Sequence, residues 1–393
     1  MDNLTHTLFG FTLSRTPLER AGRGTTAALL LASNAPDIDI VTALHGGRLA
    51  YLADHRDATH GVLGGLLLAA ATAAVVRLWY ARPWRRTPAR VPDDAAPGRD
   101  ASFPALLGVS LIGVLFHLLM DLATPYGTRI LSPFSGTWYA FDWMPVIDIY
   151  LWAILIACTI MCLVRPAQRR RIAAAALVLT LGLYAVRATA HQAALHQAAA
   201  EVAAEGIAPC TPGVDPARAP LLDLASWSDR PAGKIAAPAA GAAMAAHPGA
   251  PACLVQMAAL PTYLSPFTWR IVERFPDAYE LTDINVLPAL LPSLSGRTRA
   301  PGQRTVLWFP DQHSHWVADA AAAPSARVFL EFSRFPAVRT EHAHGRVIVR
   351  WTDVRFGGGI TRLRGRTPAI DAFGAVVQLD EQGRILHWKI GSR

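Results

Sequence analysis

The stretch Phe103–Met120 is a long, predominantly apolar run, and it constrains the fold more than any other part of the chain. An α-helix rises about 1.5 Å per residue, so a run of this length is long enough to cross a bilayer. Further apolar runs occupy Gly61–Trp79, Pro145–Val164 and Ile172–Thr189. Because so many segments of this kind lie in the first half, the sequence predicts a polytopic α-helical membrane domain.

The segments that precede these runs are shorter or interrupted. Asp2 or Asn3 can cap a first helix, Leu4–Ser14, which is short for a full span. Thr25–Leu44 is apolar but contains Pro36, which disturbs a helix. We expect a loop from His45 to Thr59 and a second loop from Ala123 to Met144.

The second half of the chain has the pattern of a soluble, mostly β domain with some helix (α+β). Apolar and polar residues alternate in several stretches, as in half-buried strands. The predicted strands are Val328–Phe335, Arg346–Val354, Ala375–Leu379 and Ile385–Ile390, with a hairpin turn at 381–384 and a short helix within 310–323. We therefore divide the chain into a membrane domain (1–190), an Ala/Pro-rich connecting region (191–252) and a β-rich domain (253–393).

Arginine distribution predicts the orientation in the membrane. The loops expected on one side carry thirteen arginines and those on the other side carry three, and the rich side is normally cytoplasmic. The thirteen are Arg15, Arg20, Arg23, Arg77, Arg82, Arg85, Arg86, Arg90, Arg99, Arg165, Arg169, Arg170 and Arg171; the three are Arg48, Arg56 and Arg129. The C-terminal domain is then extracytoplasmic, in a multi-pass membrane protein. The formal net charge of +8 is explained by this topology, and we expect no nucleic-acid partner.

Two further observations concern the N-terminal residues and the cysteines. The first residues lack the positive start and short apolar core of a signal peptide, so none is expected. Cys210 and Cys253 can form a disulfide if the second half is extracytoplasmic. Cys158 and Cys162 lie in an apolar run, where buried thiols are usually part of the core.

Histidines and aspartates fall toward the outer end of the predicted helices. His117 and Asp121 are four residues apart, so they share one face of a helix and can bind one cation. Ionisable groups in membrane segments are costly, which favours a functional role. The predicted metal ligands are His6, Asp37, His60, His117 and Asp121. A His/Asp set without cysteine suits zinc, with manganese or iron as alternatives.

Neighbouring polar residues complete a hydrolytic site. A bound metal would activate water, and Asp39 or Asp142 would serve as the general base. His55 and Arg56 would lie near the substrate, with Arg56 able to bind an anion. The location at a membrane face suggests membrane lipid as a partner and a lipid-linked or phosphoester substrate.

Other interpretations remain open at this point. The metal can be purely structural, with the soluble domain binding a partner, or the protein can be a metal or solute transporter. A transporter is expected to place polar residues near the midplane and to show repeats, and we see neither. Asp148 can be a helix-dipole residue, and Asp57 a surface charge. Four histidines of the second half offer an alternative metal site: His313, His315, His342 and His344.

Several motifs together resemble the YdjM-like family of inner-membrane proteins, described as metal-dependent hydrolases. They are Met1-Asp2-Asn3-Leu4-Thr5-His6, Ala35-Pro36-Asp37-Ile38-Asp39, His55-Arg56-Asp57-Ala58-Thr59-His60, His117-x-x-x-Asp121, Tyr126-Gly127-Thr128 and Asp142-Trp143. The resemblance covers roughly residues 1–190 and implies a metal-dependent hydrolase of the bacterial inner (cytoplasmic) membrane. Asp57 and Gly61 replace the family's usual Gly and Ser, which leaves both histidines of that motif in place. The order of these residues is also similar in spacing to zinc-dependent phospholipase C.

Overall fold

The structure, a computed structural model, describes residues 1–82, 99–210, 224–235, 253–290, 307–356 and 373–391. The chain divides into two compact units, each described by itself below. The first unit comprises Met1–Val41 and Asp54–Val186, and the second comprises Thr42–Ala53 and Arg187–Arg393.

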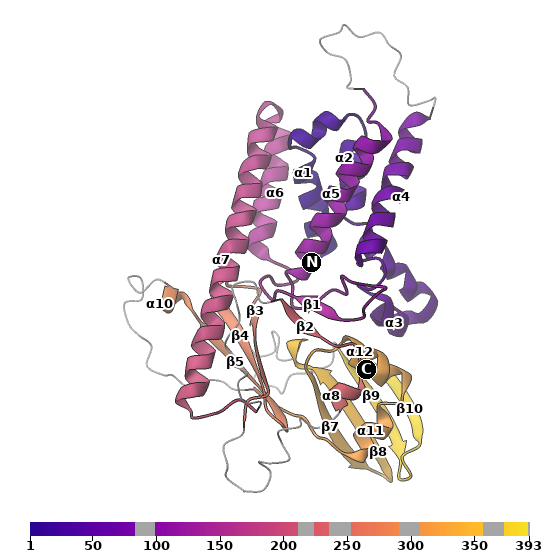
Figure 1. The fold of residues 1–393 in the computed structure, drawn as a ribbon, viewed down its shortest axis with the longest axis vertical. Coiled ribbons are helices and arrows are strands. Elements are labelled where there is room, and N and C mark those ends of the chain that lie inside the picture. The colour runs from indigo at the N-terminus through magenta and orange to yellow at the C-terminus, as the bar shows by residue number, and fades with distance from the viewer. Residues whose placement is uncertain (83–98, 211–223, 236–252, 291–306, 357–372, 392–393) are drawn as a thin grey trace. The chain divides into compact units, whose positions relative to one another are not determined.

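The first unit is a bundle of helices (Figure 1). Its α-helices are α1 (Asn3–Leu13), α2 (Thr25–Ala32), α4 (Val62–Ala81), α5 (Phe103–Leu122), α6 (Ile149–Val164) and the first part of α7 (Arg169–Ala204). Short 3-10 helices, η1 (Pro17–Ala21), η2 (Pro36–Val41) and η5 (Pro166–Gln168), and a strand, β1 (Trp138–Ala140), connect them. The core of the unit is apolar and draws residues from α1, α2, α5 and α6, among them Phe9, Leu29, Leu106 and Leu155.

Within the described residues, three helices are long and apolar enough to cross a membrane: α4, α5 and the helix Pro166–Ala204. The bent pair formed by α2 with Pro36–Asp54 would be a fourth if it is counted as one span, and α6 is a shorter apolar helix. These boundaries confirm the predicted helices at Gly61–Trp79 and Phe103–Met120. The last apolar run, Ile172–Thr189, lies within a longer helix, α7, which continues to Ala204.

Two predicted boundaries were wrong. The helix expected to begin at Pro145 begins at Ile149, because the side chain of Asp148 caps it by accepting hydrogen bonds from the backbone of Tyr150 and Leu151. The segment expected to be a loop from His45 is helical as far as Asp54 in α3 (Thr42–Asp54), with a kink at Gly47.

Close packing of α5 against α2 prepares the position of His117. A Cβ atom added at Gly113 would lie 2.8 Å from the Cβ of Ala32 and 3.3 Å from the backbone nitrogen of Ser33, so only glycine permits this approach. His117 follows one turn later on the same face of α5. The approach therefore brings its ring to the C-terminal end of α2.

The second unit contains two four-stranded antiparallel sheets. The first has the order β3–β4–β5–β6, with bounds Gln256–Pro261, Thr268–Arg274, Ala278–Asn285 and Leu307–Pro310. The second has the order β10–β9–β8–β7, with bounds Ile385–Ile390, Gly374–Asp380, Arg346–Asp353 and Pro336–Ala343. The remaining elements are α3, β2 (Ala225–Trp227), α8 (Ala232–Ile235), α10 (Leu287–Leu290), α11 (His315–Ala320), α12 (Pro324–Phe332) and η7 (Val354–Phe356).

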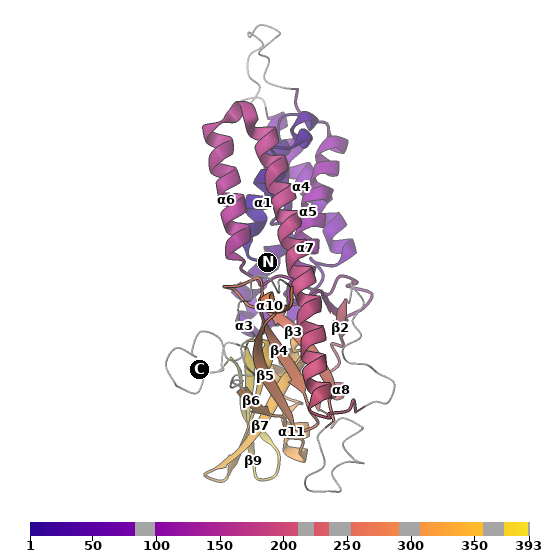
Figure 2. The same cartoon turned by 90° about the vertical axis from the view of Figure 1, so that its left-hand side faces the viewer.

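Helices cover one face of each sheet. The second part of α7 packs through Ala194 and Ala198 against Trp269 and Ile271 of β4 (Figure 2). Phe329 and Leu330 of α12 belong to a second core with the β8–β9 sheet. Cys210 and Cys253 form a disulfide, as the sequence allowed.

One predicted strand is a helix. Val328–Phe335 was expected to be a strand, but residues 324–332 form α12. Pro324 occupies the first helical turn, where its missing N–H costs nothing, and Ala326, Phe329 and Leu330 are buried at helical spacing. The strands at Arg346–Val354, Ala375–Leu379 and Ile385–Ile390, and the turn between the last two, are confirmed.

Candidate metal centre

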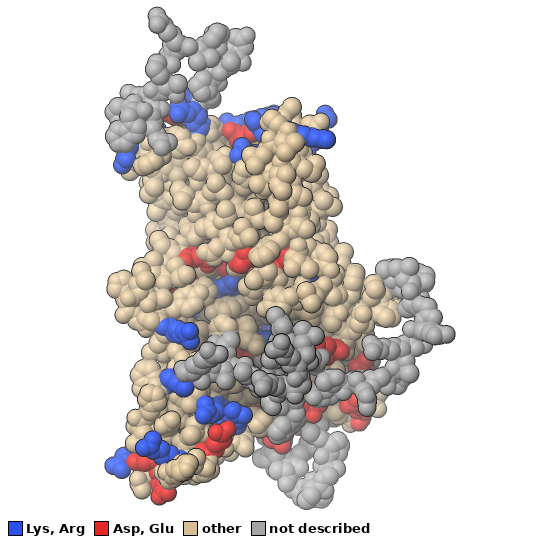
Figure 3. Space-filling view, turned by 180° about the vertical axis from the view of Figure 1, so that it is seen from behind, with Lys and Arg blue, Asp and Glu red and all other residues tan. Residues whose placement is uncertain are grey.

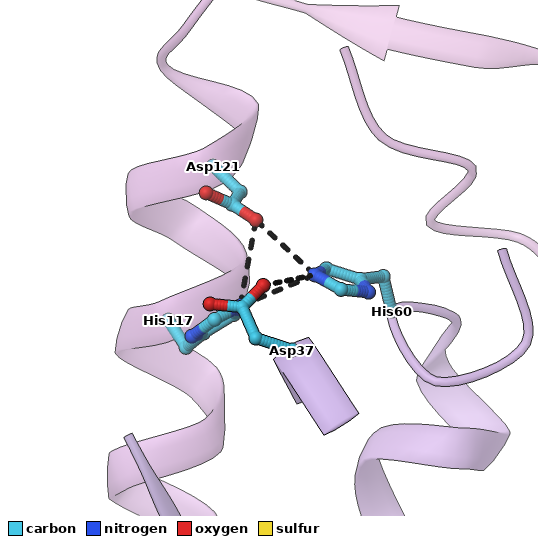
Figure 4. A group of neighbouring side chains, drawn as sticks. All are labelled: Asp37, His60, His117 and Asp121. Carbon is cyan, nitrogen blue, oxygen red and sulfur yellow. Dashed lines mark hydrogen bonds and ion pairs between the residues drawn. The ribbon is translucent and has the colours of Figure 1, made fainter. Parts of the chain in front are cut away.

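Four side chains of the first unit gather at one point: Asp37, His60, His117 and Asp121 (Figure 4). Each offers one ligand atom, and these atoms all lie within 4.8 Å of one another. His60, His117 and Asp121 are at most 1% exposed, and the side chain of Asp37 is 10% exposed. The fold brings these residues, most of which are far apart in the sequence, together in one buried cluster.

Local structure explains how each residue reaches this point. His117 and Asp121 lie one turn apart on α5, so they share a face. His60 directly precedes Gly61, the N-cap of α4. Pro36 begins η2, in which Asp39 is buried while Ile38 and Ile40 are exposed.

The distances fit a small cation. His60 Nε2 lies 3.2 Å from His117 Nε2, 3.3 Å from Asp121 Oδ2 and 3.4 Å from Asp37 Oδ1. His117 Nε2 lies 3.4 Å from Asp121 Oδ2 and 3.7 Å from Asp37 Oδ1. Ligands about 2.1 Å from a tetrahedral zinc are separated by about 3.4 Å. Five of the six distances among the four atoms are therefore close to the ligand spacing of a tetrahedral site.

Both imidazoles present the nitrogen that ligation requires. The backbone carbonyl of Ser33 accepts a hydrogen bond of 2.8 Å from His117 Nδ1, which leaves the lone pair of His117 on Nε2. His60 Nδ1 lies 3.4 Å from Asp39 Oδ2 and 3.0 Å from the hydroxyl of Thr59. Burial, followed by the nearby charge of Arg56, holds the pKa of His60 well below its ordinary value. A neutral imidazole is the form that binds a metal.

Several buried polar atoms of the cluster lack hydrogen bonds. Among the residues that the structure describes, Asp37 Oδ2, Asp121 Oδ2 and both ring nitrogens of His6 form none. Leaving such atoms unsatisfied is costly, and a divalent cation would satisfy the carboxylates directly. The donor set, two imidazole nitrogens and two carboxylates, is one that zinc, manganese and iron accept. The residues present therefore fit a metal ion.

His6 lies beside the four ligands. Its ring stacks on that of His117, with centroids 3.8 Å apart, and its Nε2 is 3.4 Å from Asp121 Oδ1. The α-amino group of Met1 also contacts Asp121 Oδ1. The predicted fifth ligand is thus adjacent to the cluster, while the other four predicted ligands form it.

Asp39 and His55 form a pair next to His60. His55 Nδ1 is 3.1 Å from each carboxylate oxygen of Asp39, and the backbone N–H of Arg56 donates to Asp39 Oδ2 at 3.0 Å. Asp39 was predicted as a general base. Its contacts with His55, Arg56 and His60 make it better suited to orienting His60.

Arg56 was predicted near the substrate, and the structure places its guanidinium on Asp121. Its Nη2 donates to Asp121 Oδ1 at 2.9 Å, and its Nη1 donates to Thr124 Oγ1 and to the carbonyl of Gly127. The guanidinium also lies 4.6 Å from the centre of the Tyr126 ring. Arg56 is 3% exposed, so its main contacts are with the protein, and it holds Asp121 in place.

Asp142, the other predicted general base, is buried in the loop after α5 with a left-handed backbone (φ 59°), and the structure does not place it in the four-residue cluster. The alternative histidine site of the second half does not form either, because the cluster of the first unit is the only group of His, Cys, Asp or Glu side chains among the described residues that could hold a metal ion. His313, for example, contacts Asp311 and the carbonyl of Ile235.

Sequence reasoning missed two supporting residues. Ser33 contributes its backbone carbonyl, which no side-chain pattern reveals. Thr124 is fully buried and bonds both Arg56 and the carbonyl of Asp121. Its position three residues after Asp121, at the end of a helix, was a signal that could have suggested this contact.

Comparison with known proteins gives a match in each half of the chain. Residues 1–194 match the YdjM inner membrane protein family, and residues 315–392 match the YfhP C-terminal alpha/beta plait domain. The uncharacterized protein YfhP of Bacillus subtilis (strain 168) is 26% identical over 159 residues, which cover 38% of this chain and 43% of that protein. The alignment thus spans less than half of the relative. No solved structure matches. The family match over residues 1–194 agrees with the motifs found in the first half of the sequence. Residues 1–194 of the chain belong to the YdjM inner membrane protein family.

Proposed function

We propose that the protein is a membrane-bound, metal-dependent hydrolase. The observation that carries this proposal is the cluster of two Nε2 atoms and two carboxylates, in which each nitrogen lies 3.2–3.7 Å from the other three donor atoms. A divalent cation there, which we expect to be zinc, with manganese or iron as alternatives, would lower the pKa of a bound water and polarise the scissile group. Asp37, His60, His117 and Asp121 would hold it.

The surrounding residues prepare the ligands and move a proton. Asp39 orients His60 through Nδ1, and Arg56 orients Asp121 through Oδ1. Supporting contacts of this kind fix ring orientation and ligand basicity. His55 is held by Asp39, and its ring centroid lies 5.9 Å from that of His60. We assign His55 as the residue that accepts the proton of the attacking water.

The substrate is proposed to be amphiphilic, such as a lipid-linked compound or a phosphoester. Asp37 is the most exposed of the four ligands, so the cluster is most accessible on the side of η2. Its neighbours Ile38 and Ile40 are 56% and 58% exposed. Exposed apolar side chains beside a polar site suit a ligand that carries both a polar group and an apolar chain.

The site is proposed to act at the outer face of the inner membrane. The arginine asymmetry of the loops supports this orientation. The disulfide between Cys210 and Cys253 also supports it, because disulfides persist in oxidising compartments.

A structural metal site is the second candidate. Four protein donors already complete a tetrahedron, whereas a catalytic zinc keeps a position open for water. The burial of three of the four ligands also favours this candidate. The two proposals differ in whether solvent reaches the metal from the side of Asp37.

One experiment separates these candidates. The full chain is purified in detergent, its metal content is measured, and hydrolysis of a panel of phosphoester and lipid-linked substrates is followed with and without chelator. A hydrolase shows chelator-sensitive turnover that returns with added zinc or manganese and is lost in His55→Ala while metal is retained. Bound metal with chelator-sensitive melting and no turnover supports the structural candidate. Absence of metal, with melting unmoved by chelator and by added zinc or manganese, refutes both.

A further inference from the structure

A second polar site lies at the opposite end of the helical unit from the metal cluster. It is a cavity of about 990 Å³, and the charged residues that line it are Glu19, Arg20, Arg23, Arg77, Arg99 and Asp100. Ser102 caps the start of α5, whereas Asp121 lies near its end. Nineteen residues of helix separate the two positions by about 28 Å, so the cavity is distinct from the metal cluster.

The backbone builds a fixed wall for this cavity. Arg23 pairs with Asp100 as an isolated parallel bridge: the N–H of Arg23 donates to the carbonyl of Arg99, and the N–H of Ala101 donates to the carbonyl of Arg23. Gly22 has φ 119°, and a Cβ there would lie 2.5 Å from the carbonyl oxygen of Arg99. This close approach requires glycine, and it holds the segment before α5 against the segment after η1.

The cavity carries an excess of positive charge, with four arginines against two acids. Both carboxylates have partners: Glu19 binds Arg169 and Arg170, and Asp100 lies 3.5 Å from Arg23. In the described part of the chain, no carboxylate lies within ion-pair distance of the three remaining arginines, Arg20, Arg77 and Arg99. Guanidinium groups in this number at one cavity form a site for an anion, and their planar fork matches phosphate.

The position of the cavity indicates where the anion comes from. It lies where α4 ends and α5 begins, and both helices are long and apolar enough to span a membrane. Leu78, Trp79 and Phe103, at these helix ends, are 69%, 44% and 41% exposed. Figure 3 shows blue basic side chains gathered at this end, next to a band of uncharged residues. Exposed apolar side chains beside a basic cavity fit a phosphate group attached to acyl chains.

We propose that this cavity binds the phosphate head group of an anionic glycerophospholipid. The acyl chains of the lipid lie along the apolar surface of α4 and α5, and Arg77 and Arg99 contact the phosphate. Basic pockets of this kind between membrane helices bind acidic lipid head groups. The site is independent of the metal cluster and of any hydrolytic activity.

The test uses the full chain in a neutral detergent, with phosphatidylglycerol, phosphatidylcholine or soluble glycerol 3-phosphate as probes. Thermal unfolding and native mass spectrometry report binding. We expect phosphatidylglycerol to raise the melting temperature and to remain bound as one retained lipid, and phosphatidylcholine and glycerol 3-phosphate to do neither. Arg77→Gln together with Arg99→Gln should weaken phosphatidylglycerol binding at least tenfold.

One control variant and one further test variant keep the outcome decisive. Arg165→Gln removes an exposed arginine that does not line the cavity, and it should bind phosphatidylglycerol as the wild type does. Arg20→Gln removes an exposed lining arginine, so it reports on the cavity even if the double variant fails to fold. Equal binding by Arg20→Gln, the double variant and the wild type overturns the proposal. If glycerol 3-phosphate raises the melting temperature as much as phosphatidylglycerol does, the proposal that a lipid occupies the cavity is overturned, because a soluble phosphate compound is then sufficient.

Discussion

The imidazole of His60 shows how individual contacts prepare the candidate metal centre. Its Nε2 is directed at the other three ligands, and its Nδ1 faces Asp39. Residues that support a ligand in this way typically contribute 10–100-fold to metal affinity. We therefore expect Asp39→Asn to weaken metal binding by about one to two orders of magnitude, measured by competition with a chelator. Asp54→Asn, a change at an exposed aspartate nearby, should have no effect. If Asp39→Asn and the wild type bind metal with equal affinity, Asp39 does not support His60 as a ligand.

The direct ligands are expected to affect both metal content and stability. His117→Ala should abolish stoichiometric metal binding and lower the melting temperature in detergent, because a ligand that binds only the folded state stabilises it. The matched control is His45→Ala, which changes an exposed histidine. Elemental analysis and thermal unfolding with and without chelator measure the two effects. If His117→Ala keeps its metal, the cluster is not the binding site.

Asp121 is less suitable than His117 as a test of metal binding by substitution, and Asp57 is less suitable than His45 as a control. Removing Asp121 would also leave the buried guanidinium of Arg56 without its carboxylate, which destabilises the fold even without metal. The sequence suggested that Asp57 is a surface charge, but Asp57 accepts hydrogen bonds from Arg129 and Ser132. A change at Asp57 would therefore disturb the loop after α5.

The sequence was informative about this site where local geometry decides the arrangement. His117 and Asp121 share a face because they are four apart on a helix, and this follows from the sequence alone. The roles of Asp39 and Arg56 depend on contacts across the fold, such as that between Arg56 and Asp121, which are 65 residues apart. Spacing cannot predict such contacts.

At the scale of elements, α12 shows why an apolar pattern can mislead. Phe329, Leu330 and Phe332 are compatible with either a short strand or a helix, since both would bury most of them. Pro324 at the first turn, and the burial of Ala326 at helical spacing from Phe329 and Leu330, favour the helix. The alternation in β8 is cleaner, because Val347, Val349 and Trp351 are buried while their neighbours are not. The strands were therefore predictable and the helix was not.

Strand β4 carries a buried acid with a consequence for pH dependence. Burial, with further contributions from Glu280 and Glu205, raises the pKa of Glu273 from its ordinary value of 4.5 to about 7. Because the folded chain binds this proton more tightly than the unfolded chain, the residue costs stability as pH rises from about 4.5 to 7. We expect Glu273→Gln to be more stable than wild type at pH 8 by roughly 1–3 kcal/mol, and close to wild type at pH 4.

Thermal unfolding of the full chain at both pH values measures this difference. The control is Glu381→Gln, in the exposed turn between β9 and β10, which should leave the pH dependence unchanged. A pH profile of Glu273→Gln parallel to that of the wild type would contradict the raised pKa.

At the scale of the whole molecule, the sequence separates a helical membrane part from a β-rich part because the two use different periods of apolar residues. The alpha/beta plait of the C-terminal region was not predicted. Its helices α11 and α12 lie between strands β6 and β7 along the chain, and the period of α12 was misread. The long helix α7 belongs to both units, and the boundary at Val186 lies within it, shortly before the apolar residues give way to polar ones such as His191 and Gln192.

The orientation in the membrane is the last prediction. The arginine asymmetry predicts that the loop 80–102 is cytoplasmic and that both the loop 123–144 and the C-terminus are extracytoplasmic. Alkaline phosphatase fused after residues 130 and 393 should be active, because it needs an oxidising compartment, and it should be inactive after residue 90. Cys210 and Cys253 should react with a maleimide only after reduction, because they are bridged. Activity at 90 with none at 393, together with free thiols at both cysteines, would reverse the topology and place the metal cluster at the cytoplasmic face.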